Sequence, residues 1–264
     1  MKRLQVWRRV QGRAFQMGLA LSGLLLVMVM AAAPAARPVL EPIRQGSRNR
    51  PQVALAINVA WGNEYLPELL AVLKRHQAVG TFFLVGNWAE RFPDLARGIA
   101  DAGHEIASHG YATVDYQGLS ADGLRHQVDD AADAIQKATG QRPVLFSPHK
   151  GEWTPALLAL LEERKYLPIH WTVDTVDWQN PPPDEMAARV LSRVGPGSII
   201  LLHPTEAAVR GLDGVLAGLE EKGLRVVRVS TLLEPDPSVG GGPSVWEPDT
   251  GVQAVWGPPQ PISP

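Results

Sequence analysis

Residues 53–85, which decide the fold, read VALAINVAWGNEYLPELLAVLKRHQAVGTFFLV. The first five and the last five residues of this stretch are short apolar runs typical of buried strands. Between them, leucines at positions 66, 69, 70 and 73 share one face of a helix, and we expect Asn63 to cap that helix. A strand, a helix and a second strand in succession indicate a parallel β-α-β unit.

The same alternation continues along the chain as far as residue 233. We expect further strands at 105–107, 143–146, 168–173, 198–202 and 224–227, with helices between them that begin after Ser120, Thr154 and Thr205. Seven strands that are apolar along their whole length are typical of an α/β parallel sheet buried on both faces. A closed eight-unit barrel usually takes about 250 residues. Residues 51–233 are fewer, which leaves a doubly wound sheet or an incomplete (β/α) barrel in one domain.

Composition excludes several classes of protein. Lys and Arg total 25 and Asp and Glu total 27, so the net charge of -2 gives no basis for a nucleic-acid partner. The hydrophobic content of 45% can fill a core and excludes a disordered acidic chain. The absence of cysteine excludes disulfides, thiolate metal sites and a catalytic thiol.

The two ends of the chain differ from its middle. Basic residues between Lys2 and Arg13 precede an apolar segment at 17–33, the pattern of an export signal. We therefore predict a signal peptide or membrane anchor over 1–36, a linker over 37–50, and an extracytoplasmic protein, either membrane-anchored or secreted. Residues 234–264 contain eight prolines and predict a disordered tail, unless Trp246 and Trp256 dock on the core or on a partner.

Polar residues follow most of the expected strands directly. Asn58 follows the first strand, His109 the third, His149 the fourth, and His203 the sixth, while Asp174 and Asp177 follow the fifth. Because the carboxyl ends of parallel strands meet at one end of a sheet or barrel, these side chains are expected to converge on a site there.

Several of these stretches together resemble one enzyme family. Residues 79–86 (VGTFFLVG), 103–109 (GHEIASH), 171–178 (WTVDTVDW) and 197–203 (GSIILLH) are similar, in order, to motifs of the polysaccharide deacetylases, carbohydrate esterase family 4. The resemblance covers about 51–233. It implies an incomplete (β/α) barrel and hydrolysis of N-acetyl groups on glycans such as peptidoglycan or chitin. It also implies a divalent, zinc-like metal.

The sequence departs from the family pattern at the residues that perform the chemistry. Asn58 stands where the family has its general base, and Val59 and Thr113 stand where it has two of its three metal ligands. Ser147 replaces the arginine that orients the base. The resemblance leaves His109 as the one metal ligand, so the ligand set is incomplete and the identity of any cofactor stays unknown.

The other half of the family's site is retained. His203 matches the general acid, and Asp174 matches an acid that holds its imidazole. Trp178, Trp153, Asn58 and His149 are candidate substrate-binding residues.

Two classes of function follow. One is a deacetylase of envelope glycans, in which His149, Lys150 or Asp115 rebuild the site. The other is an inactive glycan-binding or envelope-assembly protein. Residues 58–65 resemble members of the family from endospore-forming bacteria, which suggests a role in sporulation.

Overall fold

The structure is a computed structural model that describes residues 40–235 of the 264. The predicted export segment and the C-terminal tail, with Trp246 and Trp256, lie outside the described residues. Within 40–235, no helix has the length and apolar character needed to cross a membrane. The described elements are, in order, β1 (Gln52–Val59), α2 (Leu66–Arg75), β2 (Thr81–Leu84), α3 (Gly86–Arg91), α4 (Pro93–Asp101), β3 (Glu105–Ser108), α5 (Ala121–Arg125), the π-helical turn η1 (His126–Asp130), α6 (Ala131–Thr139), β4 (Leu145–Phe146), the 3₁₀ turn η2 (His149–Gly151), α7 (Pro155–Glu163), β5 (Leu167–Pro168), β6 (Val173–Asp174), the 3₁₀ turn η3 (Asp177–Gln179), α8 (Pro183–Leu191), β7 (Ile199–Leu202), α9 (Glu206–Glu221), β8 (Arg225–Val227) and α10 (Val229–Leu233).

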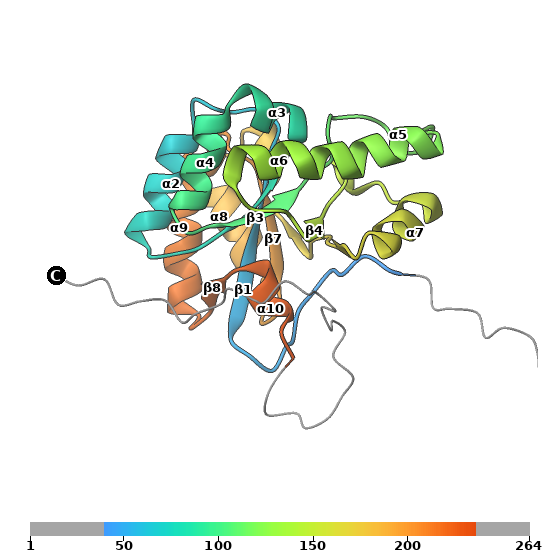
Figure 1. Ribbon diagram of the computed structural model, residues 1–264. Helices are drawn as coiled ribbons and strands as arrows, with labels where there is room; N and C mark the ends of the chain where they lie inside the picture. Colours follow the sequence, from blue (N-terminus) through green and yellow to red (C-terminus); the bar gives the residue numbers. More distant parts are fainter. Residues whose placement is uncertain (1–39, 236–264) are drawn as a thin grey trace, which may run out of the picture. The chain divides into compact units, whose positions relative to one another are not determined.

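One curled sheet of parallel strands organises this part of the chain. Its order is β5-β4-β3-β2-β1-β7-β6, and β8 also pairs with β1. β1 is long enough to hold two neighbours in succession, since β8 pairs with its first half and β2 with its second. Helices α2, α4, α6 and α9 lie along the outside of the strands (Figure 1). The expected incomplete (β/α) barrel is confirmed.

The barrel is open between β5 and β6, and there the strand prediction for 168–173 is wrong. These residues do not form one strand but pass from one edge of the sheet to the other. Ile169 N bonds to Phe146 O at 2.8 Å, whereas Thr172 N bonds to Ile199 O at 2.9 Å. The described residues therefore contain eight strands where the sequence predicted seven.

Residues 43–46, here called the strap, cross this opening. Ile43 N bonds to Pro168 O and Ile43 O accepts from His170 N, both at 2.8 Å. Gly46 N bonds to Gly197 O, also at 2.8 Å. The strap, which belongs to the linker predicted over 37–50, therefore contacts both edges of the sheet.

Alternation along β1 separates two apolar cores. Val53, Leu55 and Ile57 pack with the helices in an outer cluster. Ala54 and Ala56 face the barrel interior, in a cluster that includes residues of β2, β3, β4 and β7. Small side chains at these inner positions leave room for larger ones from the neighbouring strands.

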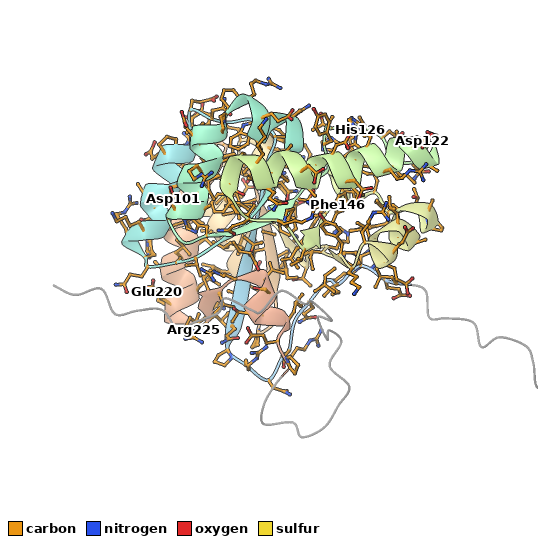
Figure 2. The ribbon with its side chains drawn as sticks, in the orientation of Figure 1. Asp101, Asp122, His126, Phe146, Glu220 and Arg225 are labelled. Atoms are coloured by element: carbon orange, nitrogen blue, oxygen red, sulfur yellow. The ribbon has the colours of Figure 1, made fainter. Side chains whose placement is uncertain are left out.

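A third cluster lies around the short strand β4. It contains the fully buried Phe146, which lies within the packed interior in Figure 2, while Asp101, Asp122 and Arg225 lie at the periphery.

Three of the predicted helix caps are confirmed. The side chains of Ser120, Thr154 and Thr205 each accept a hydrogen bond from the backbone N–H three residues later. Asn63 does not cap α2, because its Oδ1 accepts from the indole N–H of the buried Trp88 at 2.6 Å. This bond ties the loop after β1 to α3.

Candidate functional site

Polar side chains lie at the carboxyl ends of the strands, here called the rim, where the apolar interior of the barrel stops. Asn58, His109 and Ser147 each stand two residues after an inner-cluster residue, and His203 stands four after one, so alternation points all four the same way. Asn58, His109 and Ser147 are nearly inaccessible to solvent. The alternation along the strands therefore places these residues on the same side at this rim, where the sequence predicted that strand-end residues converge.

Asp177 holds His203 in place. Its Oδ1 lies 2.9 Å from His203 Nδ1, and its Oδ2 accepts from the backbone N–H of His203 at 2.6 Å. The Asp177 side chain has no exposed surface, while that of His203 keeps 12%. A carboxylate bound in this way fixes the tautomer and the orientation of the ring and directs Nε2 outward.

The prediction that Asp174 holds this imidazole is wrong. Asp174 Oδ1 instead accepts from the backbone N–H of Val176 at 2.8 Å. That contact closes a tight turn in which Val176 adopts a left-handed conformation with φ of 57°. The turn carries the chain past Asp174 and directs Asp177 to His203. Asp174 therefore stabilises the turn that positions the Asp177 carboxylate beside His203.

His109 and His149 lie beside each other at the same rim. Their ring centroids are 6.0 Å apart. His109 Nδ1 lies 2.7 Å from the carbonyl oxygen of Ser147 and therefore carries the proton. Burial lowers the pKa of His109 to about 3, although the bond to Ser147 opposes this, and the charges of His149 and His203 lower it further. Burial also lowers the pKa of His149, with Lys150 adding to the effect.

Two tryptophans predicted from the sequence and a third that was not predicted differ in exposure. Trp178, next to Asp177, is 58% exposed. Trp153 is partly buried against the cluster around Phe146, and its Nε1 is buried without a partner, so packing accounts for most of its surface. The sequence prediction missed Trp61, which is 44% exposed and stacks on His203. Its position three residues beyond Asn58 was the one available signal.

The rim does not fit the divalent metal that the family resemblance implies. Asn58 Oδ1 is buried and has no hydrogen-bond partner, but an amide oxygen is neutral and offsets the desolvation of a cation less than a carboxylate would. Val59 packs in the outer apolar cluster, and Thr113 is an exposed residue with a hydroxyl in place of an imidazole. Among residues 40–235, no three His, Asp or Glu side chains are placed to hold a metal ion.

The alternative ligands named from the sequence do not complete a site. Asp115 is exposed, and its Oδ1 accepts from Gln117 N at 2.7 Å. Lys150 is also exposed. His149 is the one of the three that stands beside His109.

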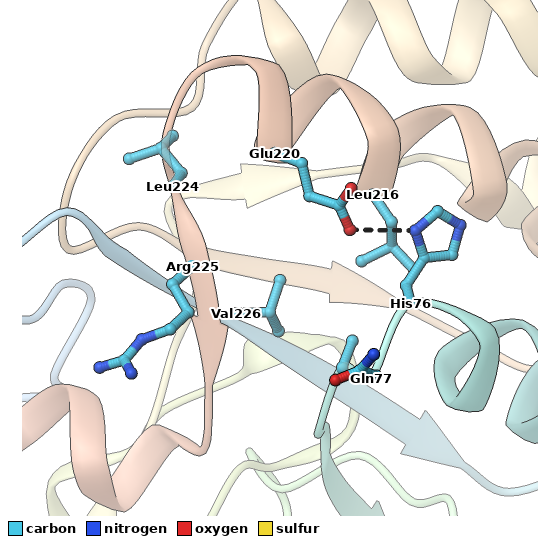
Figure 3. Close-up of a pocket in the computed structure, with 8 residues that line it drawn as sticks. His76, Gln77, Leu216, Glu220, Leu224, Arg225 and Val226 are labelled. Carbon is cyan, nitrogen blue, oxygen red and sulfur yellow. Dashed lines mark hydrogen bonds and ion pairs between the residues drawn. The ribbon is translucent and has the colours of Figure 1, made fainter.

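A separate pocket lies at the other end of the strands. It has a volume of about 100 Å³ and is lined by His76, Leu216, Glu220 and Val226, among others, and His76 bonds directly to Glu220 (Figure 3). The side chain of Arg225 points away from His76. This pocket contains none of the rim residues.

Comparison with known proteins identifies relatives over most of the chain. The polysaccharide deacetylase family model matches residues 45–169. The peptidoglycan-N-acetylglucosamine deacetylase of Bacillus cereus is 32% identical over 194 residues, which are 72% of this chain and 70% of that protein. The uncharacterized protein YlxY of Bacillus subtilis is 39% identical over 194 residues, and the chain spans 61% of its length.

Solved structures give the same relationship. The crystal structure of BA3943, described as a CE4 family pseudoenzyme from Bacillus anthracis, is 38% identical and has a TM-score of 0.72. The match covers 74% of this chain and 69% of that one. A BA3943 mutant described as having restored enzymatic activity matches with the same TM-score at 37% identity, over 74% of this chain and 71% of that one.

Proposed function

Because this chain belongs to the polysaccharide deacetylase family, carbohydrate esterase family 4, we propose that it binds an N-acetylated glycan of the cell envelope at the barrel rim without metal-dependent deacetylation. The observation that carries the proposal is the division of the rim into two halves. Asn58, Val59 and Thr113 replace the base and two ligands, while the Asp177–His203 pair is intact.

The replaced residues are those that would activate the water molecule that serves as nucleophile. Hydrolysis of an amide needs a base that takes a proton from water, and a side-chain amide at position 58 has no basic site near neutral pH. A metal would lower the pKa of that water, but the donors present do not fit one. His203 alone can donate a proton to a leaving amine or a hydrogen bond to a sugar. The remaining groups therefore support binding better than hydrolysis.

The relatives support both parts of the proposal. The Bacillus cereus relative is described as acting on N-acetylglucosamine in peptidoglycan, which indicates the class of ligand. The Bacillus anthracis relative is described as a pseudoenzyme. We extend to this chain the envelope location and an attachment to the membrane or export through residues 17–33. A role in sporulation stays a prediction from residues 58–65.

The second candidate is a hydrolase with a rebuilt site. The intact Asp177–His203 pair favours it, since a buried carboxylate that orients an imidazole is typical of acid–base catalysis. His149, beside His109, would have to supply the missing ligand or base.

Two measurements on the purified full chain distinguish the candidates. Binding of the N-acetylglucosamine pentamer is measured by calorimetry, and acetate release from the same oligomer is measured with and without added Zn²⁺, Co²⁺ or Mn²⁺. The proposal expects binding without acetate release under every condition. Metal-stimulated release would establish the hydrolase instead, and absence of binding would reject the proposal.

Restoring the family residues tests whether these positions are the ones at which the base, its orienting arginine and two metal ligands are replaced. The combined variant Asn58→Asp, Val59→Asp, Thr113→His and Ser147→Arg should gain affinity for a divalent metal and some acetate release. The matched control adds His109→Ala and should lose the metal again. Val59→Asp alone should mostly destabilise, because it places a charge in the outer apolar cluster. If the combined variant folds and binds no metal, the assignment of these positions is wrong.

A further inference from the structure

One of the most exposed large apolar side chains stacks on His203, and another is next in sequence to Asp177, the partner of that histidine. Within residues 40–235, the exposed large hydrophobic residues are Trp61 (44%), Val144 (45%) and Trp178 (58%). Trp61 stacks on His203, and Trp178 directly follows the carboxylate that holds it. Tryptophan is usually buried in large part, so two exposed indoles at one site need an explanation beyond packing.

Trp61 and His203 form a parallel stacked pair. Their ring centroids are 5.3 Å apart and their planes differ by 17°. This contact occupies one face of the indole, and nearly half of the residue remains in contact with solvent. Because Asp177 binds Nδ1 of the imidazole, Nε2 is the ring nitrogen left for another partner. The pair therefore presents an aromatic surface beside a polar ring edge.

The loop that carries Trp61 is held before any ligand arrives. Gly62 has φ of 82°, and a Cβ at this position would lie 2.0 Å from Pro204 O, so only glycine lets the loop approach the residue after His203. Gly62 O accepts from Tyr65 N at 3.0 Å, and Asn63 binds the indole of Trp88. A platform fixed in this way loses little conformational entropy when it binds.

We propose that Trp61 and His203 act together as a platform that binds one pyranose ring of an N-acetylated glycan, which rests on the proposed function above. The apolar C–H face of the sugar stacks on the open part of the indole. Nε2 of His203 forms a hydrogen bond with a hydroxyl or acetyl oxygen of the same sugar. In this role the histidine orients a ligand and transfers no proton.

The test compares substitutions at Trp61 with one at an equally exposed residue. The full chain and its Trp61→Ala, Trp61→Phe and Val144→Ala variants are titrated with the N-acetylglucosamine pentamer and, separately, with the fully deacetylated glucosamine pentamer. Trp61→Ala should weaken binding of the acetylated oligomer by about tenfold or more, as removal of a central aromatic contact does. Trp61→Phe should keep most of the affinity, and Val144→Ala all of it.

The outcomes separate the platform from the proposed function. If the unmodified chain does not bind the acetylated oligomer, the proposed function fails, whether or not it binds the deacetylated one. If it binds and Trp61→Ala binds equally well, the platform alone is overturned. Should Trp61→Ala fail to fold, the indole N–H signal of Trp61, assigned by its loss in Trp61→Phe, is followed by NMR during titration of the unmodified chain. A signal unmoved at saturation would also overturn the platform.

Discussion

At the scale of single residues, Val176 is a strained position of the rim. Its β-branched side chain disfavours the left-handed conformation that it adopts, with φ of 57°. The contact from its N–H to Asp174 Oδ1 holds it there, and Asp177 follows directly. Strain of this kind persists where the surrounding structure fixes a functional group. Here that group is the carboxylate bound to His203.

Relief of this strain should stabilise the protein. Left-handed backbone costs an ordinary residue about 1–2 kcal/mol, whereas glycine adopts it freely. Val176→Gly should therefore leave the free energy of unfolding unchanged or raise it by up to about 1 kcal/mol, as measured by urea denaturation. Val144→Gly is the control, because Val144 is exposed and its φ is not positive. It should lose stability. A comparable loss in both variants would show that Val176 is not strained.

The two acids of the turn should differ in their contribution to stability. Asp177→Ala leaves two donors of His203 without their acceptor inside the protein. Lost bonds to a buried charged group cost about 1.5–3 kcal/mol each, so we expect a loss of about 3–6 kcal/mol in total. Asp174→Ala removes a single bond to Val176 N and should cost about 1 kcal/mol. Urea denaturation of both variants measures the difference, and equal losses would contradict the assignment of Asp177 as the partner of His203.

Which polar residues reach the rim could be predicted from the sequence, but their pairings could not. His109 and His203 follow apolar runs, and period-two alternation is enough to place them. The choice between Asp174 and Asp177 depends on a left-handed turn that the sequence gives no reason to expect at a valine. The stack of Trp61 on His203 joins residues from distant parts of the chain, and no local pattern encodes it.

At the scale of elements, His76 joins α2 to α9. Its Nδ1 lies 3.1 Å from Glu220 Oε1 and its Nε2 lies 3.2 Å from Asp213 Oδ1 (Figure 3 shows the Glu220 contact). Arg75 also binds Asp213, at 2.8 Å. Only a doubly protonated imidazole donates from both nitrogens. Burial by itself lowers the pKa of His76, but the bonds to the two carboxylates outweigh burial and raise it.

The raised pKa gives the α2–α9 contact a dependence on pH. A histidine whose pKa is higher in the folded state adds stability that is complete below its ordinary pKa of 6.5 and is lost as pH rises through the folded value. His76→Gln should therefore destabilise more at pH 5.5 than at pH 8.5. The difference should stay under about 1 kcal/mol, because both carboxylates are exposed and screened. Thermal unfolding at the two pH values measures it, and a gap independent of pH would contradict the bridge.

Strands were predicted correctly where an apolar run stays at one place in the sheet. The prediction failed where the run passes from one edge of the sheet to the other. The run at 53–57 lies within β1, and the run at 198–202 begins one residue before β7 and ends with it. The run at 168–173 is apolar enough for a strand, but its two ends pair with Phe146 and Ile199 on opposite sides of the opening. An apolar run in the sequence indicates that residues are buried, not that they pair as a strand. Residues that cross the opening of the barrel can be as buried as strand residues, so the two cannot be told apart by this pattern.

At the scale of the whole molecule, burial favours the neutral form of three histidines. Burial lowers the pKa of His104 and His170 to about 4 and that of His109 to about 3. Nearby arginines add to the effect, Arg228 at His104 and Arg44 at His170. At His104 the geometry agrees, because its Nδ1 accepts from Gly80 N at 3.1 Å and cannot do so once protonated.

The protein should therefore lose stability in mild acid. Below the ordinary pKa of 6.5 the unfolded chain takes up protons at these three positions while the folded chain does not, so stability falls with pH down to about 4. Replacing His104 with Gln should flatten the profile of unfolding free energy by about 2 kcal/mol between pH 7 and pH 4. Urea denaturation at several pH values measures this. A His104→Gln profile parallel to that of the unmodified chain would show that His104 is not held neutral.

The strap sets an order of events during synthesis. Gln45 Nε2 donates to Pro196 O, 151 residues later in the chain. A ribosome adds about 5–20 residues each second, so the early partner waits roughly 8 to 30 s before the late one is made. Until then the strap can bond only to the edge at Pro168 and His170. The strap, although it is among the first residues of the folded region to be translated, thus cannot complete its contacts before residues 196 and 197 are made.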